Sequence, residues 1–219
     1  MLSRSVCLTL TVLCLFGIPA SAQLVTFTDR TAFLTAAGNT SVESFEGLAA
    51  TPRSTNPITT TFFTVTPDPS LIGILDGTVG GSGAAATDGT KFLLSYREHQ
   101  PAGTLHFKFV APITAFGLFI IDNAEIDGVV SLHTNAGEAS SEVTALQAPP
   151  LRANGNVAFF GFTQSTPFTD LFLTSTGLDD SYGIDQVTIA SAVPEPSALI
   201  FGLTGIAPVM WMRRRKATR

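Results

Sequence analysis

Cysteine, methionine and tryptophan are almost absent from this chain of 219 residues, and the few that occur lie near its two ends. They are Cys7, Cys14, Met1, Met210, Met212 and Trp211. Residues 23–192 contain none of the three. Without a thiol, this middle part can form no disulfide, no zinc–thiolate centre and no cysteine nucleophile. Its stability must therefore come from packing or from a bound ion.

Basic residues are also scarce in residues 23–192. This part has six Lys and Arg against 16 Asp and Glu, a net charge of −10. Such a surface repels the phosphate backbone, which excludes nucleic acid as a partner. It favours solubility and attracts cations such as calcium.

The longest apolar runs lie at the two ends of the chain. At the N-terminus, Arg4 precedes the apolar run Val6–Ile18, and Ala20-Ser21-Ala22 follows. A charged region, an apolar region and small residues in this order are typical of a secretory signal peptide. We expect residues 1–22 to be removed, with Ala20 and Ala22 directing cleavage before Gln23, and the remainder to be exported.

The C-terminal run has a proline-rich segment before it and a cationic cluster after it. Ala198–Met212 is 15 residues without a charge. The flanking residues are Val193, Pro194, Glu195 and Pro196 before it, and Arg213, Arg214 and Arg215 after it. At about 1.5 Å per residue, this helix would fall short of the ~30 Å hydrocarbon core, so its length also fits a buried core helix. Its position favours a transmembrane helix with a cytoplasmic cationic end.

The order of Val193-Pro194-Glu195-Pro196-Ser197, apolar stretch and arginine cluster resembles the PEP-CTERM sorting signal of Gram-negative bacteria, also called the ice-binding protein C-terminal domain. The resemblance covers about 26 residues. It implies that exosortase, a membrane-embedded enzyme, recognises and cleaves the chain near Pro-Glu-Pro after the secretion machinery has exported it. The chain would first be anchored in the inner membrane by helix 198–212, and then reach the envelope, the surface or the extracellular matrix. The predicted organisation is signal peptide 1–22, body 23–192 and sorting signal 193–219.

The body is predicted to be an all-β, antiparallel sandwich of the jelly-roll type with one short N-terminal helix. Many short apolar segments are separated by Gly, Pro, Asn and Asp, which is typical of sandwiches. Leu105, Phe107 and Phe109 alternate with polar residues, which places His106 and Lys108 outside.

We expect the helix at Arg30–Ala37, between an N-cap at Asp29 and Gly38, with Phe33 and Leu34 docking it on a sheet edge.

We expect the strands at Leu24–Phe27, Val42–Phe45, Thr60–Val65, Leu71–Leu75, Lys91–Tyr96, Thr104–Val110, Ala115–Ile121, Val129–His133, Glu142–Leu146, Val157–Phe162, Thr169–Thr174 and Ile184–Ile189.

Three acidic clusters are candidates for calcium binding, because calcium prefers carboxylate and carbonyl oxygens on turns. Turn chemistry without a metal explains the same residues equally well. The clusters are Glu43 with Glu46; Asp122, Asn123, Glu125 and Asp127; and Asp179, Asp180, Ser181 and Asp185.

Three short segments of the body resemble bacterial jelly rolls related to carbohydrate-binding modules. They are Ser44-Phe45-Glu46-Gly47, Asp88-Gly89-Thr90-Lys91-Phe92-Leu93-Leu94 and Tyr182-Gly183-Ile184-Asp185-Gln186-Val187. The resemblance implies that Glu46, Asp88 and Asp185 hold a structural calcium ion.

Three hypotheses for the function follow. The first is a non-catalytic, exported protein of the cell surface or extracellular matrix, with a structural or interaction role. The second is a glycan-binding module of the exopolysaccharide matrix. Sugars usually stack on Trp or Tyr rings, and the body has no Trp and only two Tyr, Tyr96 and Tyr182. The third is a secreted hydrolase that uses a carboxylate pair. No catalytic residue is assigned. Ice binding would need a regular flat threonine array, and Thr59-Thr60-Thr61 is only a short run.

Overall fold

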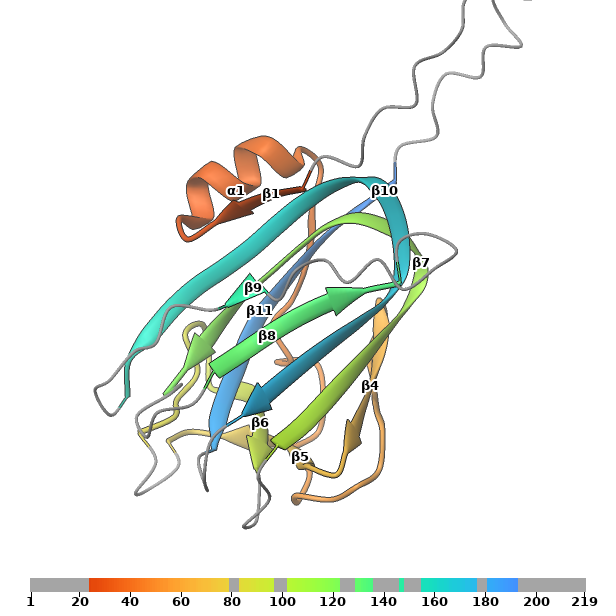
Figure 1. Ribbon diagram of the computed structural model, residues 1–219. Helices are drawn as coiled ribbons and strands as arrows, with labels where there is room; N and C mark the ends of the chain where they lie inside the picture. Colours follow the sequence, from red (N-terminus) through yellow and green to blue (C-terminus); the bar gives the residue numbers. More distant parts are fainter. Residues whose placement is uncertain are drawn as a thin grey trace, which may run out of the picture.

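The computed structural model describes residues 24–78, 83–96, 102–122, 129–135, 146–147, 155–176 and 181–192. The described chain is almost entirely antiparallel β-strand with one helix, α1 (Arg30–Ala37) (Figure 1). The strands are β1 (Leu24–Phe27), β2 (Ser41–Glu43), β3 (Ile58–Thr59), β4 (Phe63–Asp68), β5 (Leu71–Asp76), β6 (Lys91–Tyr96), β7 (Ala102–Ile121), β8 (Val129–Thr134), β9 (Leu146–Gln147), β10 (Val157–Thr176) and β11 (Tyr182–Ser191).

Two strands of 20 residues each, β7 and β10, run through both layers of the molecule. They pair with each other along nearly their whole length, and Figure 1 shows both ribbons bending together. The register shifts between Thr163 and Asp170, where Phe168 pairs with Ile113. Pro112 and Pro167 lie in these bends. Proline has no N–H for the ladder, so it belongs at an irregularity and not in a regular central strand.

The bends divide the strand network into two layers. Sheet I has the order β3-β4-β7-β10-β8-β9 and uses the first part of β7 and the last part of β10. Sheet II has the order β5-β6-β11-β7-β10-β1, with β2 also paired to β11, and uses the other parts of the two long strands. The prediction of an all-β sandwich is therefore confirmed. The finer jelly-roll assignment stays a prediction.

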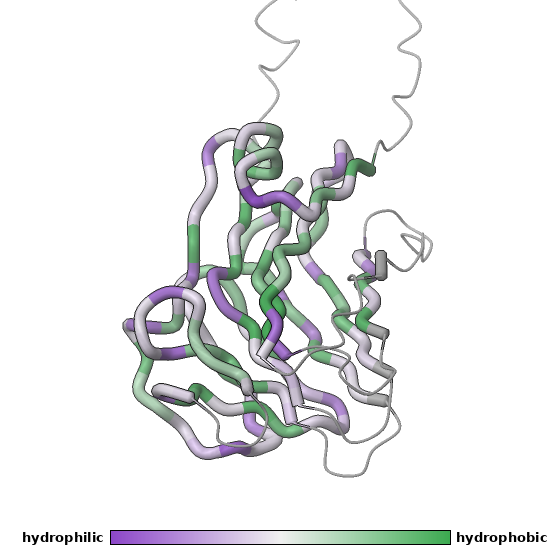
Figure 2. The backbone as a smooth tube through the Cα atoms, turned by 90° about the vertical axis from the view of Figure 1, so that its left-hand side faces the viewer, coloured by the Kyte–Doolittle hydropathy of each residue, from purple (hydrophilic) through white to green (hydrophobic). Residues whose placement is uncertain are grey.

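The main core lies between the two sheets and is rich in phenylalanine. Alternation places Leu105, Phe107 and Phe109 of sheet I inward, as predicted, and Phe116, Leu118 and Ile120 of sheet II opposite them. Phe109 packs edge-on against Phe116 at a centroid distance of 5.9 Å. Figure 2 shows hydrophobic residues following the strands and hydrophilic residues gathering at turns. Burying such side chains contributes about 1.5–3 kcal/mol each.

Helix α1 begins and ends where the sequence predicts. The Asp29 carboxylate accepts a hydrogen bond from Ala32 N at 2.7 Å, and Gly38 has a positive φ of 73° with its N–H bonded to Leu34 O. Its docking differs from the prediction, because Phe33 lies on the outer face of sheet II and not at a sheet edge. Gly117 and Gly161 face each other across β7 and β10 and leave the space for the Phe33 ring.

Residues 83–90 cover a part of the outer face of sheet II that helix α1 does not cover. They place Ala84 against Phe92, Leu94 and Ile121 in a small buried cluster. Sheet II is therefore covered on both faces. This explains why Ala115–Ile121 is apolar on both sides, as expected of a central strand.

Several predicted strand boundaries change. The separate predictions Thr104–Val110 and Ala115–Ile121 are one strand, β7, and Val157–Phe162 and Thr169–Thr174 are likewise one strand, β10. The predicted strand Thr60–Val65 was wrong at its start, because Thr60–Phe62 is the turn between β3 and β4. Phe45 is not in a strand: it has φ 62°, and its N–H bonds to Glu43 Oε1.

The two ends of the chain, with Ala20, Ala22, Gln23 and the whole of 193–219, lie outside the described residues, as does most of the predicted strand Glu142–Leu146. Among the residues that are described, no helix meets the length and apolarity of a membrane span. The predicted helix 198–212 lies outside these residues and stays a prediction.

Candidate functional site

Asp185 of β11 is fully buried and holds the turn that precedes β6. Its Oδ2 accepts hydrogen bonds from Thr87 N and Thr87 Oγ1, both at 2.7 Å, and from Asp88 N at 3.1 Å. Its Oδ1 accepts a bond from Gln186 N at 2.7 Å. Gln186 Nε2 donates to Thr87 Oγ1 at 3.1 Å and closes the network. Charge-assisted bonds of this kind are about twice as strong as neutral ones.

Glu46 holds the same turn from its other side. Its Oε1 accepts hydrogen bonds from Thr90 N at 2.8 Å and from Lys91 N at 2.6 Å. Lys91 Nζ in turn donates to the carbonyl oxygens of Glu46 and Leu48 at 3.0 and 2.6 Å. Gly89, with φ 69°, lies so close to Glu46 that a Cβ atom there would overlap the carboxylate.

The structure thus brings the predicted residues Glu46, Asp88 and Asp185 to one turn, residues 87–91. Glu46 and Asp185 accept hydrogen bonds from N–H groups of the turn, while Asp88 offers its own N–H and is exposed. A cation would have to compete with these donors for Asp185 Oδ2 and Glu46 Oε1. No group of three metal-ligating side chains occurs within the described ranges. Calcium binding by these three residues stays a prediction.

Of the other acidic clusters, only part is described. Asp122 directly follows β7 and is fully buried, with φ 58°. Ser181 is partly buried and precedes β11. Asn123, Glu125, Asp127, Asp179 and Asp180 lie outside the described residues.

The outer face of sheet I carries a polar array around one aromatic ring. The register aligns Thr66, His106, Phe172 and His133 on four neighbouring strands. A second line holds Asp68, Thr104, Thr174 and Ser131, and a third includes Thr64, Lys108 and Asp170. His106 stacks on Phe172 with a centroid distance of 4.5 Å and an interplanar angle of 13°. We call this array the Phe172 face.

Hydrogen bonds fix one end of the Phe172 face. His106 Nε2 and Asp170 Oδ1 are 2.7 Å apart. Asp170 Oδ2 accepts bonds from Asn135 Nδ2 and Thr169 Oγ1, both at 2.7 Å. Burial by itself would raise the pKa of Asp170, but these hydrogen bonds from Thr169 and His106, with the charges of His106 and Lys108, hold it below its ordinary value.

The sequence did not point to the Phe172 face as a site. Sequence analysis indicated only Tyr96 and Tyr182 as rings on which a sugar could stack. Tyr182 is buried, and the Arg53 guanidinium carbon lies over the Tyr96 ring, 4.4 Å from its centre. The outward placement of His106 and Lys108 was predicted from alternation and is confirmed. The same alternation extended to Phe172 would have found the face, but the pairing partners of β10 are a tertiary property.

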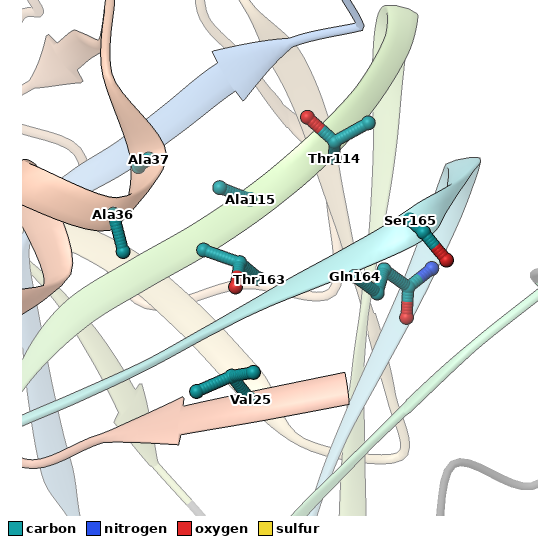
Figure 3. Close-up of a pocket in the computed structure, with 8 residues that line it drawn as sticks. All are labelled: Val25, Ala36, Ala37, Thr114, Ala115, Thr163, Gln164 and Ser165. Atoms are coloured by element: carbon teal, nitrogen blue, oxygen red, sulfur yellow. The ribbon is translucent and has the colours of Figure 1, made fainter. Parts of the chain in front are cut away.

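Two shallow hollows lie beside the C-terminal end of α1. One, of about 320 Å³, is shown in Figure 3, with Ala37 and Thr114 among the residues that line it. The other shares these two residues and extends to Ser191 and Ala192. The first hollow is lined by Val25, Ala36, Ala37, Thr114, Ala115, Thr163, Gln164 and Ser165. Its lining contains hydroxyl, amide and methyl groups but no charged side chain.

Comparisons with known proteins give only distant structural likenesses. No family model and no curated protein matches the chain. The K2 cleaved adhesin domain of Lys-gingipain aligns at 13% identity over 69% of this chain and 99% of that domain, with a TM-score of 0.43. The Stig cyclase Fisc from Fischerella sp. TAU aligns at 15% identity over 79% and 100%, with a TM-score of 0.37. A second cyclase from Fischerella sp. TAU aligns at 13% identity over 76% of this chain and 96% of that protein, with a TM-score of 0.37.

Proposed function

We propose that this chain is an exported protein of the cell surface or extracellular matrix, with a non-catalytic structural or interaction role. A signal peptide at 1–22 and a PEP-CTERM sorting signal at 193–219, recognised by exosortase, direct its export. The helix 198–212 first holds it in the inner membrane. The β-sandwich is the part that acts after sorting.

One structural observation carries the support for this proposal: the two described ends of the sandwich lie at the same end of the molecule. Leu24 pairs with Gln164 at the bend of β10, and Ala192 N bonds to Pro112 O at the bend of β7. The last residues of β7 and the first residues of β11 lie at the opposite end, where Gly183 pairs with Ile121. A membrane segment that follows residue 192 would therefore leave the opposite end of the sandwich turned away from the membrane.

The sorting proposal is tested by replacing Pro194, Glu195 and Pro196 together with alanine in a Gram-negative host that has exosortase. We expect the triple variant to be exported but not processed, so the uncut chain accumulates in the inner-membrane fraction. Mass and location are measured by immunoblotting of cell fractions with an antibody against the sandwich.

Pro52→Ala is the matched control, because Pro52 is an exposed proline of the body. It should be processed and sorted like the unaltered chain. If the triple variant is cut and distributed as the control is, the sorting proposal is wrong.

The Phe172 face favours a second candidate function, a glycan-binding module of the exopolysaccharide matrix. A partly buried aromatic ring beside imidazole, hydroxyl and carboxylate groups offers both apolar contact area and hydrogen-bond partners for a sugar. Because Phe172 and His106 are held parallel, the ring is fixed before a ligand arrives.

The glycan candidate is tested on a glycan array with the purified full chain and with Phe172→Ala. Truncating the ring should abolish binding or weaken it at least about 10-fold, since stacked aromatic contacts dominate such sites. Val110→Ala is the control, because Val110 is 77% exposed and lies at the bend of β7, outside the face. An array without any binding, or equal losses in both variants, would reject this candidate.

A further inference from the structure

Asp122 is a buried carboxylate that the hydrogen bonds of the described chain satisfy on one side only. The residue is fully buried where β7 ends. Its Oδ1 accepts a bond from Gly155 N at 2.8 Å, and its own N–H bonds to Asn156 O at 2.7 Å. Its Oδ2 is buried and has no hydrogen-bond partner among the residues that the structure describes. This contrasts with Asp185, where both oxygens accept hydrogen bonds.

A buried carboxylate oxygen without a donor is unfavourable, because it has lost water and gained nothing in return. Burial raises the pKa of Asp122, and the hydrogen bond from Gly155 offsets this only in part. Protonation does not solve the problem, since an O–H group at Oδ2 would then need an acceptor of its own. A positive ion satisfies the oxygen and neutralises the charge together.

A backbone carbonyl oxygen lies against Gly155, the residue whose N–H bonds Asp122 Oδ1. A Cβ atom at Gly155 would lie 3.3 Å from the Gly83 carbonyl oxygen, so this oxygen lies against the residue that bonds Asp122. Gly83 and Gly155 both have positive φ, 74° and 73°, which glycine adopts without a steric penalty. Asp122 thus bonds Gly155, and Gly155 in turn packs against Gly83.

We propose that Asp122 Oδ2 binds a hard cation of the calcium class. Calcium takes six to eight oxygen ligands, commonly carboxylate, carbonyl and water oxygens. This site is distinct from the turn held by Glu46 and Asp185, where Glu46 Oε1 and both Asp185 oxygens already accept hydrogen bonds. The ion would neutralise the carboxylate that joins the end of β7 to Gly155.

The test uses the full chain, expressed in a host without exosortase, purified in detergent and stripped with EDTA. Equilibrium dialysis against CaCl₂, followed by elemental analysis, measures bound calcium. We expect the unaltered chain to bind one calcium ion that Asp122→Asn loses or binds at least about 10-fold more weakly. Asparagine keeps the size of the side chain and an oxygen for Gly155 N.

Glu46→Gln is the matched control, because it alters a carboxylate at the other candidate turn and leaves Asp122 untouched. It should bind calcium as the unaltered chain does. The inference is overturned if the unaltered chain binds no calcium. That is the result expected if a water molecule, and not a cation, satisfies Asp122 Oδ2. It is equally overturned if Glu46→Gln loses the ion while Asp122→Asn keeps it.

Hydrogen exchange of the unaltered chain gives a readout that does not depend on the folding of a variant. Calcium should slow amide exchange in peptides covering 119–122 and 155–159, because the ion joins these segments. Exchange in the peptide covering 87–91 should stay the same. Protection confined to 87–91, or no change at all, would contradict a site at Asp122.

Discussion

Replacing Gly161 with alanine tests how helix α1 is held on sheet II. A Cβ atom at Gly161 would lie 2.9 Å from Phe33 Cδ2 and 3.1 Å from Phe159 Cε1. Real Cβ atoms essentially never come closer than 3.0 Å to a heavy atom outside their own residue and its two chain neighbours. Gly161 lies inside a regular stretch of β10, opposite Gly117, so alanine meets a steric conflict and not a backbone one.

The magnitude follows from two opposing terms. Alanine in place of a strand glycine stabilises the folded state by about 0.5–1 kcal/mol through backbone entropy. Overpacking a well-filled site costs about 1–3 kcal/mol. Because Phe33 is fully buried and also packs on Phe159 at a centroid distance of 5.3 Å, it has little room to move. We therefore expect Gly161→Ala to lower the free energy of unfolding by about 1–2 kcal/mol.

Urea unfolding of the full chain, followed by circular dichroism, measures this free energy. The control is Gly47→Ala, because a Cβ atom there has nothing within 4 Å and the glycine has no positive φ. Phe33→Leu removes the ring that Gly161→Ala would strike. In that background the cost of Gly161→Ala should fall by about 1 kcal/mol, as expected for residues in contact. Equal stability of Gly161→Ala and Gly47→Ala, or an unchanged cost of Gly161→Ala in the Phe33→Leu background, would refute the reasoning.

Three further predictions concern buried or hydrogen-bonded carboxylates. Asp185→Asn should lower the free energy of unfolding by about 2–3 kcal/mol and speed amide exchange of residues 87–91, because it weakens charge-assisted hydrogen bonds. Asp88 is exposed, so the control Asp88→Asn should change the free energy of unfolding by less than about 0.5 kcal/mol. The lowered pKa of Asp170 means that its carboxylate stabilises the folded state above the unfolded pKa of 3.8, and that this stabilisation is lost as pH falls through the lower folded pKa. Asp170→Asn should remove this acid sensitivity in a pH series of urea melts. An unchanged pH dependence of the free energy of unfolding would contradict the prediction. The raised pKa of Asp122 acts in the opposite sense. In EDTA, the free energy of unfolding should fall as pH rises from the unfolded pKa of 3.8 through the higher folded pKa. The same fall in Asp122→Asn would contradict the prediction, because the variant lacks the titrating carboxylate.

Some features of the fold depend on neighbours in sequence, and these could be predicted. The bounds of α1 follow from the Asp29 cap and from Gly38, which act within one turn of the helix. The inward direction of Leu105, Phe107 and Phe109 follows from the two-residue period of a strand. The apolar run of Ala115–Ile121 indicated a central strand, and β7 is paired on both sides there.

Other features depend on which strands meet, and local patterns do not contain that information. The sequence divided β7 and β10 at their bends because Pro112 and Pro167 interrupt the alternation. Mutual pairing carries both strands through these bends into the second sheet. The position of α1 was mistaken for the same reason, since only the register of β7 against β10 places Gly117 opposite Gly161 and opens the space for Phe33.

The sequence by itself determined the all-β class, the helix Arg30–Ala37, the acidic and thiol-free body, and the expectation of export and sorting. These follow from composition, from short-range periodicity and from motifs at the chain ends. Only the tertiary structure decided what the carboxylates do. Asp185 accepts hydrogen bonds from a turn almost 100 residues away in sequence, while Asp122 keeps one buried oxygen without a partner in the described part of the chain. Burial and pairing are properties of the packed chain, so two aspartates that look alike in sequence acquire different chemistry.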